Sequence, residues 1–324
     1  MAQNYVVSID MGGTKILGAL INSKSGIVAT TKKPTERKTG KAKYAQALYE
    51  TVEKLIEVSG VKEEQIKAIC LGVPGSVNPH TGIIGLAPNL GIKNYNIKKD
   101  LQKFTKIPVL IENDVNLGAL GIQKFGAAKG KKNVLVVFVG TGIGSGIILD
   151  GKLYRGTSMT AGEIGHMIVD PEGPVCGCGQ FGCFEALASR TAIVRDIIPK
   201  LKKKKGGALV KTFRKTGQIK SRALAAAVEA QEKEAVWAVN RSCEVIGQVL
   251  ANINNLMNFE MIVLGGGVLE ALGTHMMPKI KEAFSRYTLK DPAKHVKIVE
   301  SKLGDESAIY GGLALAEEFL DIKV

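Results

Sequence analysis

The chain has 324 residues, of which 45% are hydrophobic and 23% charged, the composition of an ordinary globular protein. The length suits two domains or one large one, and the composition excludes a disordered chain, a collagen-like fibre and a coiled coil. The net charge is +14, but aromatic residues make up only 5% and do not interleave with the lysines, as stacking platforms for single-stranded nucleic acid usually require. No apolar run is long enough to cross a bilayer, and the N-terminus lacks a secretion signal. We therefore expect a cytoplasmic protein without a nucleic-acid or membrane partner.

Strands alternate with helices along the chain. The expected strands are 5–9, 16–21, 68–73, 107–111, 134–139, 147–149 and 261–264, and the expected helices are 44–58, 221–257 in two pieces and 308–320. This alternation predicts an α/β fold, in which ligands bind beyond the carboxyl ends of the strands.

Two segments share the layout strand, glycine turn, strand. In the first, Gly12 and Gly18 are six residues apart, and in the second Gly140 and Gly146 have the same spacing. The repeat predicts a duplicated architecture with two turns suited to phosphate groups. Neither a Walker A loop nor a dinucleotide fingerprint fits, since Leu153 and Ser145 stand where those motifs need a hydroxyl and a glycine.

The first glycine turn follows Asp10, at the end of a predicted buried strand. The Asp10 carboxylate could hold Mg²⁺, directly or through water, beside a bound triphosphate. The turn Gly12–Lys15 would offer amides, a hydroxyl and a cation to the phosphates. An ordinary hairpin with a capping aspartate is the alternative.

A second acidic residue, Asp114, follows the strand 107–111. It lies beside Asn113, whose amide can orient a polar ligand. A carboxylate here could take the proton of a hydroxyl that attacks a phosphoryl group. The alternative is an N-cap for the following helix.

One histidine and three cysteines predict a metal site: His166, Cys176, Cys178 and Cys183. One imidazole with three thiolates matches a tetrahedral structural zinc site, although the C-x-C spacing differs from the common C-x₂-C. Glu163 and Glu185 flank this segment, and such carboxylates either grip hydroxyl-rich ligands or are simply exposed. Cys70 and Cys243 stand in apolar surroundings and are interpreted as core thiols.

Taken together, these segments resemble the ROK family of bacterial sugar kinases, and most of all its glucokinases, from Ser8 to about Ala316. The residues that carry the resemblance are Asp10–Lys15, Glu112–Asn116, Gly140–Gly144, Ala161–His166, Cys176–Glu185 and Leu264–Gly267, all in family order.

The resemblance implies an actin-like, hexokinase-type (ribonuclease H-like) α/β fold with a cleft between two domains. The smaller would comprise residues 1–118 with 308–324, and the larger, 119–307, would carry the zinc site. A homodimer or homotetramer is also implied.

The same resemblance implies that ATP with Mg²⁺ phosphorylates the 6-hydroxyl of glucose, a step of glycolysis, with Asp114 as the catalytic base. The implied sugar contacts are Asn89, Asn113, Asp114, Glu163, His166 and Glu185. The implied nucleotide contacts are Asp10, Gly12, Gly13, Thr14, Lys15, Gly140, Thr141, Gly142, Gly265, Gly266 and Gly267. His166 would bind both zinc and sugar.

Several alternatives remain open. Other kinases of this family act on fructose, N-acetylmannosamine, N-acetylglucosamine or allose. A sugar-responsive repressor would need a helix-turn-helix, for which only nine residues precede Asp10. The lysine clusters Lys129–Lys132 and Lys202–Lys205 are interpreted as solvated, with inorganic polyphosphate as an alternative donor bound there.

Overall fold

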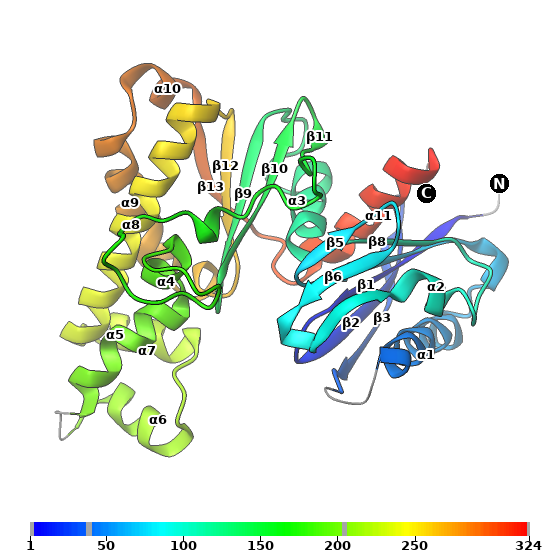
Figure 1. The fold of residues 1–324 in the computed structure, drawn as a ribbon, viewed down its shortest axis with the longest axis horizontal. Coiled ribbons are helices and arrows are strands. Elements are labelled where there is room, and N and C mark those ends of the chain that lie inside the picture. The colour runs from blue at the N-terminus through cyan, green and yellow to red at the C-terminus, as the bar shows by residue number, and fades with distance from the viewer. Residues whose placement is uncertain (1–2, 37–40, 203–205, 323–324) are drawn as a thin grey trace. The chain divides into compact units, whose positions relative to one another are not determined.

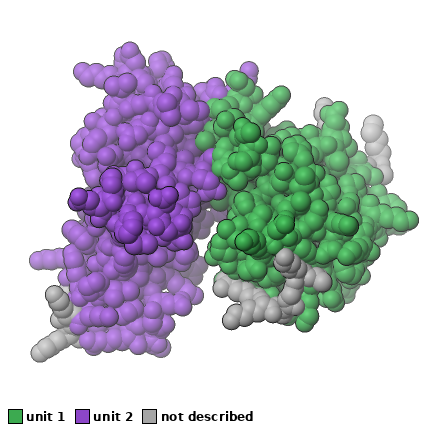
Figure 2. Space-filling view, in the orientation of Figure 1, with its two compact units in different colours: residues 1–130, 146–161, 305–324 green, residues 131–145, 162–304 purple. Residues whose placement is uncertain are grey.

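A computed structural model describes residues 3–36, 41–202 and 206–322, whose ribbon is drawn in Figure 1. Lys203–Lys205 of the second lysine cluster lie outside these residues. The chain forms two compact units, coloured separately in Figure 2: unit 1 is 1–130, 146–161 and 305–324, and unit 2 is 131–145 and 162–304. The domain boundaries expected from the sequence stay a prediction. Among the described helices, none has both the length and the hydrophobicity needed to cross a bilayer.

Unit 1 is built on a twisted five-stranded sheet with a small three-stranded sheet beside it. Its strands are β1 (Tyr5–Met11), β2 (Lys15–Asn22), β3 (Gly26–Pro34), β4 (Ile66–Val73), β5 (Ser76–Asn78), β6 (Ile83–Ala87), β7 (Ile92–Asn96) and β8 (Val109–Asn113). Its helices are α1 (Lys41–Ser59), α2 (Ile97–Leu101), α3 (Asp114–Phe125) and α11 (Glu306–Leu320), with short 3₁₀ turns at Glu63–Gln65 and Pro88–Leu90.

Unit 2 combines a second sheet with a larger set of helices. Its strands are β9 (Val134–Val139), β10 (Ile143–Leu149), β12 (Met261–Gly265) and β13 (Lys297–Glu300); β10 passes into unit 1 at Gly146, where β11 (Lys152–Leu153) follows. Its helices are α4 (Phe184–Ala188), α5 (Arg190–Lys202), α6 (Ala208–Thr216), α7 (Ser221–Glu229), α8 (Lys233–Met257), α9 (Leu269–Tyr287) and α10 (Lys290–His295), with a 3₁₀ turn at Ile164–His166.

The two five-stranded sheets have the same strand order. The first runs β3-β2-β1-β4-β8 and the second β11-β10-β9-β12-β13. In each, the strand that precedes the glycine turn is central, and the next two strands on one side run parallel to it. The duplicated architecture predicted from the two glycine turns is therefore confirmed at the level of sheet order.

Helices α1 and α11 cover opposite faces of the unit 1 sheet. Ser8 and Ile9 are successive residues of β1, so their side chains point to opposite faces. The Ser8 hydroxyl donates to the carbonyl of Ala308 in α11 (3.3 Å). Gly18, which pairs with Ile9, lies against Thr51 of α1. Cys70 and Cys243 are fully buried, as predicted for core thiols.

Helix α3 is held against α11 by glycines that allow the two backbones to touch. A Cβ on Gly311 would lie 1.8 Å from the carbonyl oxygen of Leu117, and one on Gly121 would lie 1.9 Å from that of Ser307. No side chain fits at either position without moving a helix. The crossing thus fixes the position of α3, whose first residue is Asp114.

We predict that Gly311→Ala lowers the free energy of unfolding by about 1–3 kcal/mol or more, because the clash is with rigid backbone. Urea denaturation monitored by circular dichroism measures this. Gly206→Ala is the matched control, since a methyl group there meets nothing within 4 Å. An equal loss in both variants would contradict the proposed crossing.

Candidate active site

The carboxyl ends of β1 and β8 bring two predicted site residues together. Both strands run parallel to β4, which lies between them, so their ends share one edge of the sheet. Asp10 lies next to the end of β1, and Asp114 directly follows β8. A Cβ on Gly72 of β4 would lie 3.5 Å from the Cα of Asp114, so β4 passes directly beside this residue.

The environment of Asp10 disfavours its charge. Burial of the carboxyl group, followed by the nearby charge of Asp114, raises the pKa of Asp10 from 3.8 to about 7. Lys15 opposes this rise, but its ammonium group is ion-paired with Asp305 at the start of α11, and Asp305 itself adds to the rise. Two carboxylates at this edge fit a divalent cation with oxygen ligands such as Mg²⁺.

The turn between β1 and β2 is closed by hydrogen bonds of its own. The amide of Gly12 donates to the carbonyl of Lys15 (2.9 Å), and the hydroxyl of the buried Thr35 donates to the carbonyl of Gly12 (2.7 Å). Thr35 follows β3 and also donates its amide to Thr14 (3.1 Å). Gly12–Lys15 is therefore a preformed turn.

Asn113, rather than Asp114, caps helix α3. Its side-chain oxygen accepts from the amides of Val115 (2.9 Å) and Asn116 (3.0 Å). Its side-chain nitrogen donates to the carbonyl of Gly75 (3.0 Å), which leaves one N–H of this amide for a ligand. The N-cap considered for Asp114 is formed instead by the residue before it. The Asp114 Oδ1 accepts the amide of Val115 (2.9 Å).

The remaining predicted sugar contact of unit 1, Asn89, is exposed on the 3₁₀ turn Pro88–Leu90. The turn is anchored by the hydroxyl of Tyr44, which donates to the carbonyl of Leu90 (2.7 Å). Gly75, the acceptor for Asn113, packs against Leu86 just before this turn. The backbone of Gly75 therefore lies between the Asn113 side chain and residues Leu86 and Ala87, which lead into the turn that carries Asn89.

In unit 2, the structure brings the other two glycine segments together. Gly266 has φ +89° and lies so close to Val139 that a Cβ would meet its carbonyl oxygen at 2.7 Å. Val139 is the residue before Gly140, and it also accepts the amide of Val268 (3.1 Å). The turns Gly140–Gly142 and Gly265–Gly267 therefore pack on one another.

The turn Gly140–Gly142 is held from the start of α5. The amide of Gly140 donates to Gly142 (2.9 Å), and the amide of Arg190 donates to the carbonyl of Gly140 (2.9 Å). The hydroxyl of Thr191 donates to the carbonyl of Thr141 (2.7 Å). Strand β10 begins directly after the turn, at Ile143 rather than at the predicted residue 147, because its glycines at 144 and 146 are part of the strand.

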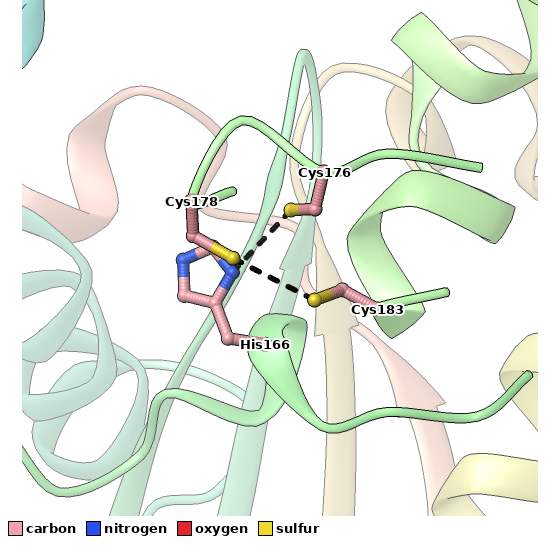
Figure 3. Close-up of side chains that lie close together, drawn as sticks. All are labelled: His166, Cys176, Cys178 and Cys183. Atoms are coloured by element: carbon pink, nitrogen blue, oxygen red, sulfur yellow. Dashed lines mark hydrogen bonds between the residues drawn. The ribbon is translucent and has the colours of Figure 1, made fainter. Parts of the chain in front are cut away.

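His166, Cys176, Cys178 and Cys183 lie together as predicted, with their ligand atoms all within 4.8 Å of one another (Figure 3). The His166 Nδ1 is 3.6 Å from the sulfur of Cys176, and the sulfurs of Cys178 and Cys183 are 3.7 Å apart. A disulfide needs about 2.05 Å. A metal tetrahedron with bonds of about 2.3 Å has edges of about 3.8 Å. The geometry therefore suits four ligands of one metal ion.

The thiols of this cluster differ in acidity. The backbone N–H of Gln180 lowers the pKa of Cys178, whereas burial raises the pKa of Cys183 to about 12. A metal ion would have to displace the Cys183 proton, so binding would release protons and strengthen with pH.

Glu185 connects the cluster with the glycine turn. One of its carboxylate oxygens accepts the amide of Ile143 (2.8 Å), and the other lies 3.9 Å from the Cys176 sulfur. Glu163 and His166 are exposed at the two ends of the 3₁₀ turn Ile164–His166. The imidazole of the His/Cys cluster and a neighbouring carboxylate are thereby exposed to solvent.

The sequence analysis missed two charged residues that contact the predicted site. Asp305 pairs with Lys15, and Arg155 contacts Glu112, which precedes Asn113. Neither Asp305 nor Arg155 belongs to a recognisable motif. Glu112 had a detectable signal, since it is an acidic residue at the end of an otherwise apolar strand.

The chain belongs to the ROK family, whose model matches residues 6–319. It is 34% identical over 313 residues to a glucokinase of Halalkalibacterium halodurans, covering 96% of this chain and 94% of that one. A ROK hexokinase structure from Thermus thermophilus superposes with a TM-score of 0.82 at 31% identity, covering 98% and 99% of the two chains. A ROK glucokinase from Streptomyces griseus, solved with glucose and AMPPNP, gives 0.82 at 27% identity, covering 97% and 100%. The predicted family and the actin-like, hexokinase-type fold are confirmed.

We predict that Asp10→Asn stabilises the cation-free protein at pH 8. The folded-state pKa of Asp10 is raised, so its contribution to stability is fully present below pH 4 and is lost as pH rises through about 7. The melting temperature of the variant should therefore exceed that of the unmodified protein at pH 8, and the difference should shrink towards pH 4. Asp291→Asn, at a side chain 86% exposed, is the control. A constant difference across this range would contradict the electrostatic account.

Proposed function

We propose that this chain is an ATP-dependent glucokinase that transfers the γ-phosphoryl group of ATP to the 6-hydroxyl of glucose, giving glucose 6-phosphate and ADP. The observation that carries the proposal is the pair Asp10 and Asp114 at one edge of the unit 1 sheet, where burial and then the charge of Asp114 raise the pKa of Asp10. The likeness to a family member solved with glucose and AMPPNP supports the same reaction.

Asp114 is the proposed catalytic base. Its backbone is fixed at the first turn of α3, and its carboxylate would accept the proton of the 6-hydroxyl as that oxygen attacks the γ-phosphorus. The bond between the γ-phosphorus and the bridging oxygen breaks as the new bond forms, and ADP leaves with that oxygen.

Asp10 is the proposed contact for Mg²⁺, directly or through water. When bound, Mg²⁺ would neutralise the phosphate charge and offset the repulsion between Asp10 and Asp114. The turns Gly12–Lys15 and Gly140–Gly142 would donate amides to the phosphates, and Lys15 would leave Asp305 to contact them. The turn Gly265–Gly267 would contact the nucleoside.

The proposed sugar contacts are those of the family resemblance: Asn89, Asn113, Asp114, Glu163, His166 and Glu185. The geometry supports two of these roles most directly. Asn113 keeps one amide N–H for a sugar hydroxyl, and Glu163 presents an exposed carboxylate. We further propose a structural zinc ion on His166 and the three cysteines, and a cytoplasmic homodimer or homotetramer.

We predict one zinc ion per chain in the purified protein. Cys178→Ser should weaken zinc binding by more than the ~10- to 100-fold that loss of an outer hydrogen-bond partner costs, because a direct ligand is removed. Elemental analysis after dialysis measures the occupancy. Cys243→Ala removes a thiol outside the cluster and should keep one zinc. Zinc-free protein with an intact fold and full activity would refute the assignment.

We predict that Asp114→Asn lowers kcat for glucose phosphorylation by ~10²- to 10⁴-fold, the usual contribution of a general base. Glucose should still bind, since the amide keeps the shape of the carboxyl group, and calorimetry measures this. Asp291→Asn is again the control and should keep the unmodified kcat. Undiminished turnover by Asp114→Asn would remove Asp114 from the mechanism.

A further inference from the structure

Glu112 is a buried charge that the proposed mechanism leaves without a role. It precedes Asn113 at the end of β8, and its side chain is 1% exposed. One carboxylate oxygen accepts the amide of Asn113 (2.9 Å) and the side-chain nitrogen of Asn116 (3.1 Å). The other accepts the Nε of Arg155 at 2.7 Å. Both oxygens are therefore engaged at the start of helix α3.

Arg155 reaches Glu112 from a distant part of the chain. It follows β11, and its side chain is 11% exposed. Its two terminal nitrogens donate to the carboxylate of Glu318 in α11, at 2.7 and 3.1 Å. Its guanidinium group also lies 5.4 Å from the ring centroid of Phe319. All four residues belong to unit 1. The guanidinium group of Arg155, in the segment that follows β11, therefore connects strand β8 with helix α11.

We propose that the Arg155–Glu112 ion pair is a positioning device for the catalytic pair Asn113 and Asp114; this inference rests on the proposed function. Glu112 fixes the amide of Asn113 and the side chain of Asn116, while Asn113 fixes the amides of Val115 and Asn116. The peptide that leads into Asp114 therefore has its direction set by Glu112.

The arginine is what makes this arrangement rigid. A buried carboxylate needs a charged, hydrogen-bonded partner, and removal of one partner of a buried pair leaves the other uncompensated. Without Arg155, Glu112 would turn towards water and release Asn113 and Asn116. A catalytic base must lie within about 2.6–3.2 Å of the proton it takes. A displacement of about 1 Å at Asp114 is therefore enough to slow the reaction.

The test compares Arg155→Met with Arg155→Lys and with Glu318→Gln, using glucose and Mg-ATP as substrates. Arg155→Met should lower kcat by ~10- to 100-fold, the scale of a 1 Å misplacement. The KM for ATP should stay unchanged, because the residues proposed to bind ATP lie elsewhere. Arg155→Lys keeps the charge and should recover part of the lost kcat.

Glu318→Gln is the matched control, because it removes the partly exposed partner of Arg155 and leaves Glu112 paired. It should change kcat less than about fivefold, since ion pairs of this exposure are weak. A purely structural role would predict instead that melting temperature falls with Arg155→Met while kcat per folded molecule stays constant. That result overturns the inference. If Arg155→Met does not fold, the same comparison of kcat and melting temperature is made between Arg155→Lys and the unmodified protein.

Amide hydrogen exchange separates this inference from the proposed function. The amides of Val115 and Asn116 should exchange faster in Arg155→Met, or in Arg155→Lys if the first variant does not fold, and at unchanged rates in Glu318→Gln. Unchanged exchange in the arginine variants overturns the inference whether or not the protein phosphorylates glucose. If the unmodified chain forms no glucose 6-phosphate, the proposed function fails, and faster exchange then supports only the positioning of α3.

Discussion

Two carboxylates brought to one edge of the unit 1 sheet are the constraint on which the rest of the site depends. Burial, followed by repulsion from Asp114, raises the pKa of Asp10 to about 7. Such a pair is costly for the protein alone and favourable only when a cation lies beside it. The surrounding structure serves to keep the pair in place: β4 packs against Asp114, the glycines of α3 and α11 fix the helix, and Glu112 with Arg155 holds its first turn.

The two five-stranded sheets share one strand order but differ in the side chains at the ends of their strands. Aligning the glycine turns by their spacing places Phe138 of β9 at the position of Asp10 in β1. Only the first copy therefore carries the acid, while both copies keep a glycine turn closed by a hydrogen bond of its own, from Gly12 to Lys15 and from Gly140 to Gly142. Unit 2 has in addition the cysteine cluster, which Glu185 connects to its glycine turn. The duplication supplies two similar scaffolds, and single residues at the strand ends decide what each can bind.

The sequence predicted the elements whose signals are local. Strand β9 was predicted to the residue because it is an uninterrupted apolar run rich in valine, and the break between α7 and α8 coincides with Gln231 in a left-handed conformation. The sheet β5-β6-β7 was not predicted, since its strands have three to five residues and little apolar alternation. The cysteine cluster was predictable because its ligands lie within 18 residues of one another.

Contacts between distant segments could not be predicted in this way. Arg155 meets Glu112 across 43 residues and Glu318 across 163, and nothing near Arg155 in the sequence indicates either partner. The same holds for Lys15, whose partner Asp305 lies 290 residues away. The family resemblance supplied the roles of Asn89 and Glu163, which periodicity and charge alone leave open.

The most direct test of the central claim is the identity of the product formed from glucose and Mg-ATP. Phosphorus and carbon NMR of the reaction mixture would follow both substrates together. The account predicts glucose 6-phosphate and ADP in equal amounts, formed ~10²- to 10⁴-fold more slowly when Asp114 is replaced by Asn. Glucose that binds but is never phosphorylated, or a phosphate at another hydroxyl, would contradict it.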